Sequence, residues 1–315
     1  MDDDRPTLDE LHEQLRGPLS DSLPASSDTL QIEYLCQPKD VADDPAKLLV
    51  RDGESRKLSV VLVSAPADPG LVGRGMRIAA QTKARLGARL GDVILEPLGE
   101  GTIEGLSYVI LPFCRPIGEG KVARRYWRLV LRRSVLDWLA EANASTLVEA
   151  SAADVADSFE LPLERMAESQ LVDGALRRAA NEALGRLKRG DWQPRFVFMH
   201  GDLWEDNLLL APPSRAKGEG RGEYPFVVID WPGATLRGYA MYDLIRLASS
   251  MRLRGRGLRR EVLRHCEILG GEPEDAPGYL LAGLGHLSFN LGCFSPEVYL
   301  EMSRTCFNDL EAVLA

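Results

Sequence analysis

The chain has 315 residues, of which 45% are hydrophobic and 27% are charged, and its formal net charge is −9. This length suits two packed lobes or one large fold with a sizeable core, and the acidic balance argues against a general nucleic-acid-binding protein, which is normally basic. No apolar window is long enough to predict a membrane span, and the acidic N-terminus MDDDRPTLDE lacks the basic and then apolar pattern of a signal peptide, so we expect a cytoplasmic protein.

The first part of the chain predicts a small sheet with one helix. Thr7 and Glu10 have capping-box spacing ahead of a short helix over residues 8–15, and PLSDSLPASS predicts a linker, so residues 1–29 are expected to form an N-terminal extension. Five short apolar runs predict strands, with a hairpin at Asp52-Gly53, and they cover residues 30–35, 47–50, 58–65, 93–98 and 106–113. A mixed apolar face over residues 71–90 predicts one helix after the third strand, and the glycine-rich stretch 99–105 predicts a turn. We expect this sheet lobe to span residues 30–115.

Residues 116–315 predict a second, mainly helical lobe. Ser295 and Pro296 have the N-cap and first-turn identities that begin a helix. The expected helices cover residues 126–142, 161–189, 242–251, 258–269 and 296–314. Two short strands interrupt them at residues 195–199 and 225–230, and the loop-like composition of residues 211–225 between these strands predicts a surface excursion.

Polar residues follow directly after both of these strands. The first run ends in His200, Gly201 and Asp202, with Asn207 five residues later, and the second ends at Asp230. Mg²⁺ prefers oxygen ligands from one or two carboxylates, completed by waters and substrate phosphates, and Asn207 with Asp230 could supply the protein's share. Asp202 would then be free to accept the proton of an attacking hydroxyl group, which is the remaining need in phosphoryl transfer.

Two segments here resemble one family. HGDLWEDN matches the pattern HGDxxxxN, and IDWPGATLRGYAMYDLIRL resembles the stretch that follows it in the aminoglycoside phosphotransferase and choline kinase family. The resemblance implies an α+β, two-lobed, protein-kinase-like fold, with a small antiparallel-sheet N-lobe that carries one helix and a larger, mainly helical C-lobe. It also implies ATP bound between the lobes near residues 112–117 and a small-molecule acceptor.

The same resemblance assigns roles to residues of this chain. It implies that Asp202 is the catalytic base and that His200 supports the catalytic loop. It implies that Asn207 and Asp230 hold magnesium, and that Asp243 braces the loop from the following helix.

The first half departs from the family's pattern. Kinase-like folds place a lysine on the third strand to hold the nucleotide phosphates, paired with a glutamate on the next helix, whereas here Val63 or Ser64 occupies the lysine's place and the helix has no matching glutamate. Either Lys57, Arg74 or Arg77 replaces the lysine from a shifted position, or nucleotide binding is weak or lost.

We therefore expect an ATP- and Mg²⁺-dependent phosphotransferase that acts on a hydroxyl group of a small molecule. Two alternatives stay open: a pseudokinase or ligand-binding module without turnover, and a metal-dependent phosphate-ester hydrolase. The sequence indicates neither the acceptor nor the oligomeric state.

Two further features have alternative interpretations. The basic segment MRLRGRGLRR, residues 251–260, predicts either a solvated turn between two helices or a contact with an anionic substrate or partner. Trp204 and Trp231 each adjoin an acid of the two matching segments, so they could line a substrate pocket or pack in the structure.

Overall fold

The structure is a computed structural model, and it describes residues 5–24, 29–37, 41–118, 120–211, 224–288 and 295–314. It divides the chain into two compact units: unit 1 is residues 1–117 with 208–233, and unit 2 is residues 118–207 with 234–315. The expected boundaries at 29/30 and 115/116 stay predictions. Most of the expected surface excursion, residues 212–223, lies outside the described residues.

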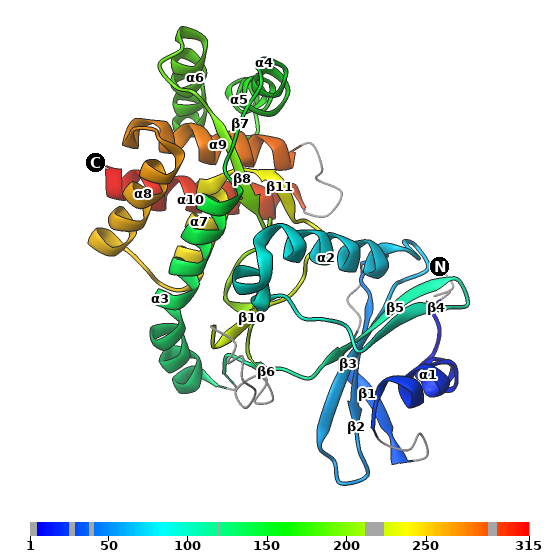
Figure 1. The fold of residues 1–315 in the computed structure, drawn as a ribbon. Coiled ribbons are helices and arrows are strands. Elements are labelled where there is room, and N and C mark those ends of the chain that lie inside the picture. The colour runs from blue at the N-terminus through cyan, green and yellow to red at the C-terminus, as the bar shows by residue number, and fades with distance from the viewer. Residues whose placement is uncertain are drawn as a thin grey trace. The chain divides into compact units, whose positions relative to one another are not determined.

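Unit 1 is built on a five-stranded antiparallel sheet in the order β1-β2-β3-β5-β4 (Figure 1). Its strands are β1 (Gln31–Cys36), β2 (Ala46–Arg51), β3 (Lys57–Val63), β4 (Gly99–Ile103) and β5 (Leu106–Pro112). The predicted hairpin between β2 and β3 is present, and the Asp52 carboxylate accepts the backbone N–H groups of Glu54 and Arg56 there. The sequence thus predicted three strands, a helix and two strands in the right order.

Helix α1 (Leu8–Ser22) begins at the predicted capping box but runs seven residues past the predicted end at Leu15, through Pro18. The predicted helix ended too early because the segment that contains Pro18 was predicted to be a linker. Leu11, Leu15 and Leu19 are almost fully buried in the same cluster as residues of the sheet. Tertiary packing on this apolar face outweighs the local cost of the proline.

Helix α2 (Leu71–Leu90) has the predicted bounds, but the fourth strand lies elsewhere than expected. The run 93–98 makes only one isolated bridge, Ile94 to Val228, whereas the glycine-rich residues 99–103 form β4. The prediction of a turn over 99–105 was therefore wrong for residues 99–103. Their pairing with β5 supplies the hydrogen bonds of a strand and outweighs the low strand propensity of the glycines.

Two small antiparallel sheets complete the strands. In unit 1, β6 (Arg115–Pro116), β9 (Leu208–Leu210) and β10 (Phe226–Val228) are ordered β10-β9-β6. In unit 2, β7 (Val148–Glu149), β8 (Arg195–Met199) and β11 (Thr235–Gly238) are ordered β11-β8-β7. The second sheet matters most for function, because β8 leads into HGDLWEDN.

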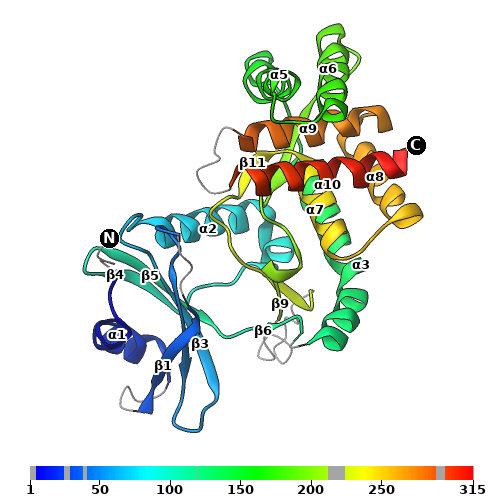
Figure 2. The ribbon, with the colours of Figure 1, turned by 180° about the vertical axis from the view of Figure 1, so that it is seen from behind.

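The rest of unit 2 is helical (Figure 2). Its helices are α3 (Lys121–Thr146), α4 (Ala152–Val155), α5 (Leu161–Glu168), α6 (Gly174–Arg189), α7 (Ala240–Ser250), α8 (Gly255–Leu269), α9 (Ala276–Leu287) and α10 (Pro296–Leu314). The single helix predicted over 161–189 is two helices, because Asp173 caps a new start at α6. Helix α10 begins as predicted, with the Ser295 hydroxyl accepting the N–H of Val298.

Helix α9 was not predicted, and it occupies the interior of unit 2. Most of its residues are buried, and it packs against α5, α6, α7 and α10. Aromatic side chains lie beside it, with the ring of Phe159 5.4 Å from Tyr239 and 6.1 Å from Tyr279. No described helix of the chain is both long and apolar enough to cross a membrane.

Candidate active site

The candidate site begins where strand β8 stops. The strand is held from α3, because the Thr146 hydroxyl accepts the backbone N–H of Phe198 at 2.8 Å. Gly201 has a φ of 84°, a left-handed conformation that glycine adopts without strain. The chain therefore turns sharply between His200 and Asp202.

Asp243 of α7 braces this turn, as the family resemblance implied. Its carboxylate accepts the N–H of His200 at 2.5 Å and the N–H of Gly201 at 3.1 Å. Burial raises the pKa of the Asp243 carboxyl to about 6, and the N–H groups that it accepts oppose that rise. His200 is fully buried, and its Nδ1 accepts the N–H of Asp202 at 3.3 Å, so its role within these contacts is to shape the loop.

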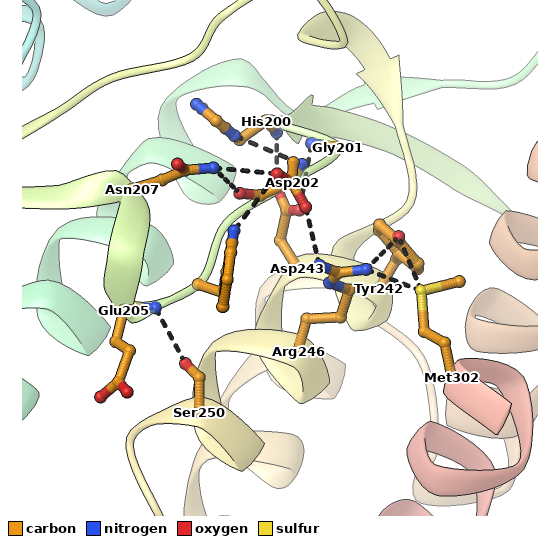
Figure 3. A network of polar contacts seen from close by, with 11 residues as sticks. His200, Gly201, Asp202, Glu205, Asn207, Tyr242, Asp243, Arg246, Ser250 and Met302 are labelled. Carbon is orange, nitrogen blue, oxygen red and sulfur yellow. Dashed lines mark hydrogen bonds and ion pairs between the residues drawn. The ribbon is translucent and has the colours of Figure 1, made fainter. Parts of the chain in front are cut away.

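Three donors orient the Asp202 carboxylate (Figure 3). Its Oδ2 accepts Nε1 of Trp204 at 3.2 Å and Nδ2 of Asn207 at 2.9 Å, and its Oδ1 accepts Nη2 of Arg246 at 2.7 Å. Trp204 is thus a hydrogen-bond donor to Asp202, which the sequence did not suggest. The side chain of Asp202 is 36% exposed, so the carboxylate is both fixed and accessible.

Arg246 contacts the Asp202 carboxylate, although the sequence analysis did not single it out. It is mostly buried, and its Nη1 also contacts the Tyr242 hydroxyl at 3.2 Å and Sδ of Met302 at 2.6 Å. A signal was available, because Arg246 stands three residues after Asp243 on one helix and residues so spaced lie on the same face. Both side chains of α7 therefore serve the loop that carries Asp202.

Glu205 ties the same loop to α3. Arg128 makes a two-pronged ion pair with the Glu205 carboxylate, donating Nη2 to Oε1 at 2.5 Å and Nε to Oε2. Only 15% of the Arg128 side chain and 9% of the Glu205 side chain are exposed. Arg124 lies 3.6 Å from Glu205 and 3.3 Å from Asp206. The acids of HGDLWEDN thus have separate tasks, since Glu205 and Asp206 pair with α3 while Asp202 faces α7.

Asp230 belongs to unit 1. It is exposed, it follows β10 by two residues, and its φ of 69° is unusual for a residue other than glycine. Strained backbone of this kind is often found at functional sites. The neighbouring Trp231 is buried and donates Nε1 to the carbonyl oxygen of Val228 at 3.0 Å, so it packs in the structure.

Strand β3 ends at Val63 and Ser64 follows it, so no lysine stands at the position that the family pattern gives it. Val63 and Ser64 are buried, and the Ser64 hydroxyl is hydrogen-bonded to that of Ser107. Lys57 begins the strand and lies 5.0 Å from the centre of the Phe113 ring. None of these three side chains provides a free cation near the end of the strand.

The cations of α2 are placed differently. Arg74 and Arg77 are exposed, and Arg74 is engaged in an ion pair with Asp68. Lys83, which the sequence did not single out as a candidate, donates Nζ to the carboxylate of Glu96 at 2.7 Å and lies 3.4 Å from the carbonyl oxygen of Ile94. Ile94 bridges to Val228, so Lys83 lies near the strand that leads to Asp230.

The donor set suits a hard cation better than a transition metal. Among the described residues, no cluster of three or more His, Cys, Asp or Glu side chains is placed to hold a metal ion. Asn207 donates Nδ2 to both the backbone oxygen and the carboxylate of Asp202, which fixes its amide and leaves Oδ1 out of those bonds. The Asn207 amide oxygen is of the hard type that Mg²⁺ prefers, and so is the carboxylate of Asp230 in unit 1.

Comparisons with known proteins identify the family and the fold of the chain. The family model described as "Phosphotransferase enzyme family" matches residues 88–277. The choline kinase LicA from Streptococcus pneumoniae is 14% identical, with a TM-score of 0.51 over 95% of this chain and 99% of that one. A choline/ethanolamine kinase family protein from Mesorhizobium loti is also 14% identical, with a TM-score of 0.51 over 96% and 98%.

A third solved structure, a protein from Haemophilus somnus 129PT named as a candidate fructosamine-3-kinase, is 14% identical, with a TM-score of 0.52 over 95% of this chain and 97% of that one. A comparison with the sequences of curated proteins returns no match. At these identities the structural likeness shows the fold alone, and it confirms the expected α+β, protein-kinase-like architecture.

Proposed function

Because the chain belongs to the phosphotransferase enzyme family, we propose that it transfers the γ-phosphoryl group of ATP to a hydroxyl group of a small molecule. The observation that carries this proposal is the Asp202 carboxylate, which is exposed on the catalytic loop and held by Arg246, Trp204 and Asn207. Phosphoryl transfer needs little covalent chemistry from the protein, so a rigidly placed base and charge neutralisation are the main requirements.

The contacts of Asp202 indicate which atom takes the proton. A carboxylate offers about four lone-pair positions, two on each oxygen. Among the residues that the structure describes, Oδ2 already accepts two donors, from Trp204 and Asn207, whereas Oδ1 accepts only one, from Arg246. Oδ1 therefore has the remaining lone pair, and we assign to it the hydroxyl proton of the acceptor.

Asn207 and Asp230 would hold the magnesium ion that accompanies ATP. Asn207 directly precedes β9, Asp230 follows β10 by two residues, and Leu208 of β9 is paired with Val228 of β10. Both side chains carry oxygen atoms, the ligand type that Mg²⁺ prefers. When bound, the ion neutralises negative charge that develops on the phosphates.

The nucleotide phosphates need a cation to replace the absent lysine of β3. Arg74 and Arg77 remain our candidates because both are exposed cations on α2, the helix that follows β3. Of the two, Arg74 would have to leave its ion pair with Asp68. Lys83 is a further cation of this helix, and its Nζ lies near the carbonyl oxygen of Ile94, which bridges to Val228 of the strand before Asp230.

The test combines binding with turnover. ATP should raise the melting temperature clearly with Mg²⁺ and only weakly without it, since a ligand of the folded state stabilises by RT ln(1 + [L]/Kd). Asp230→Ala should abolish the metal-dependent part. Turnover is then measured with ATP, Mg²⁺ and a panel of amino sugars, choline, homoserine and ketosamines. With the acceptor found, Asp202→Asn should lower kcat by about 10²- to 10⁴-fold and leave nucleotide affinity nearly unchanged.

The same measurements separate the alternatives. A protein that binds Mg²⁺ and ATP but phosphorylates no acceptor of the panel would favour the ligand-binding reading over the kinase. Absence of any Mg²⁺-dependent shift at millimolar ATP would refute the proposal. Release of phosphate from phosphate esters without ATP would instead favour a hydrolase.

A further inference from the structure

The basic segment 251–260 does more than connect two helices. It runs from the end of α7 into the first turns of α8, and its Arg260 lines a cavity of about 570 Å³ between α3 and α8. These two helices lie side by side within unit 2 (Figures 1 and 2). The volume is in the range of about 300–1,000 Å³ that is usual for small-molecule sites.

The cavity is rich in charge, with an excess of cations. Its charged lining residues are Arg132, Arg133, Arg260, Arg264, Asp137 and Glu261. Four arginines against two acids give the cavity two surplus positive charges, although the whole chain has a net charge of −9. A concave surface of this kind concentrates anions, and two surplus charges match a dianion.

The two acids do not neutralise the arginines fully. Asp137 pairs with Arg264 at 2.6 Å and with Arg133 at 3.4 Å, and Glu261 pairs with Arg260 at 3.0 Å. The acids hold these three guanidinium groups around the cavity. Each guanidinium has five N–H donors in a planar arrangement, so donors remain for a ligand.

One lining arginine has unused hydrogen-bonding capacity. Arg132 makes no hydrogen bond or ion pair with any residue that the structure describes. Glu261 is only 3% exposed, and it pairs with Arg260 at 3.0 Å and with Arg264 at 3.5 Å. The donors of Arg132 are therefore the ones that a ligand can use without breaking an ion pair of the cavity.

We propose that this cavity is a second ligand site, which binds a small phosphate ester. The phosphate dianion is recognised by Arg132 and Arg260. Leu129, Leu136 and Leu253 supply apolar wall for the carbon skeleton. Arginine suits this task because its planar donors match phosphate oxygens in pairs. The site does not depend on the proposed phosphotransferase activity, since Asp202 and its partners take no part in it.

The experiment is titration calorimetry on the full chain without divalent ions, so that nucleotide-type binding is not supported. The probes are glucose 6-phosphate, inorganic phosphate and succinate, which separate a phosphate ester, free phosphate and a dicarboxylate. We expect saturable binding of glucose 6-phosphate, about 10-fold or more weaker binding of succinate, and intermediate binding of inorganic phosphate.

Variants assign the binding to the cavity. Arg132→Gln combined with Arg260→Gln should weaken glucose 6-phosphate binding by about 100-fold, whereas Arg178→Gln, a change at an exposed arginine of α6, should leave it unchanged. Glu261→Gln should strengthen the binding of inorganic phosphate about threefold or more, because it removes a negative charge from the cavity. Thermal melts followed by circular dichroism establish that each variant is folded.

Three results would overturn the proposal. The first is no saturable binding of glucose 6-phosphate up to about 10 mM, the weak end of specific small-molecule binding. The second is equal weakening by the double arginine variant and by Arg178→Gln, which would point to general charge effects. The third is succinate binding as tightly as the ester, which would remove the phosphate-ester assignment.

Discussion

The ion pair between Arg128 and Glu205 leads to a quantitative prediction about how α3 holds the loop that carries Asp202. Both side chains are largely buried, and the pair is two-pronged. Removing one partner of a buried pair typically costs about 3–5 kcal/mol, whereas exposed pairs contribute about 0.2–1 kcal/mol. Arg124 lies 3.6 Å from Glu205 and would partly compensate for a lost Arg128. We therefore expect a coupling free energy of about 2 kcal/mol between the two residues.

A double-mutant cycle measures this coupling free energy. The variants are Arg128→Met, Glu205→Gln and the two changes together, and a matched cycle on the exposed pair Arg304 and Glu301 serves as the control. The control should give at most about 0.5 kcal/mol, because its side chains are 52% and 71% exposed. The double variant should be more stable than Arg128→Met alone, since it leaves no unpaired buried carboxylate.

Urea denaturation followed by tryptophan fluorescence is the suitable assay. Four of the five tryptophans, all except Trp231, lie in unit 2 with the ion pair, so the signal reports mainly the unit that is perturbed. A coupling free energy no larger than that of the control pair would refute the view that α3 fixes the loop through Glu205.

Three other predictions test the loop, the core of unit 2 and helix α1. Asp243→Ala should speed amide hydrogen exchange at His200 and Gly201 by about 10-fold or more, because each N–H loses a charged acceptor; unchanged rates would contradict the bracing role. Burial lowers the pKa of His265 to about 4, below its value of about 6.5 in an unfolded chain, so the unfolded state gains a proton first and stability falls as the pH drops through this window. Between pH 7.5 and pH 5 the wild type should lose about 2 kcal/mol more than His265→Gln in urea titrations, and parallel losses would disprove the assignment. Leu11→Ala should destabilise unit 1 by about 2–4 kcal/mol in thermal melts, since this fully buried side chain packs on the sheet. A change below about 0.5 kcal/mol would show that α1 does not stabilise the sheet.

The elements that the sequence predicted well are those with a clear local pattern. The alternating runs of β2 and β3 and the capped start of α10 needed no knowledge of their partners. Helix α9 had no such pattern, because APGYLLAGLGHL is apolar all round and rich in glycine. Its helical state follows from burial among four other helices, which a single sequence does not display. Strand β4 was missed for the same reason, since its glycines are ordered by pairing with β5.

The residues of the candidate site also divide into those that a local sequence pattern predicted and those that only the fold brings together. Asp202, Asn207 and Asp230 were found because they follow strand ends within recognisable segments, and their roles remain predictions. Arg246 was within reach of a helical-spacing argument from Asp243. The partner of Glu205 was not, because Arg128 lies 77 residues away in the chain and only the fold brings the two together.

Unit 1 is made of two separate stretches of the chain, and this affects the order in which its strands can pair during synthesis. Strand β9 pairs with β6, and β10 pairs with β9, although β6 ends at Pro116 and β9 begins at Leu208. A ribosome adds about 5–20 residues per second, so β6 waits on the order of 10 s for its partner. During that interval the residues of the five-stranded sheet and of α1 have all been synthesised, while the edge of β6 that β9 will cover is unpaired. Expression of residues 1–117 alone would leave that edge permanently unpaired, whereas a fragment that ends after Gly233 contains every strand of both sheets of unit 1.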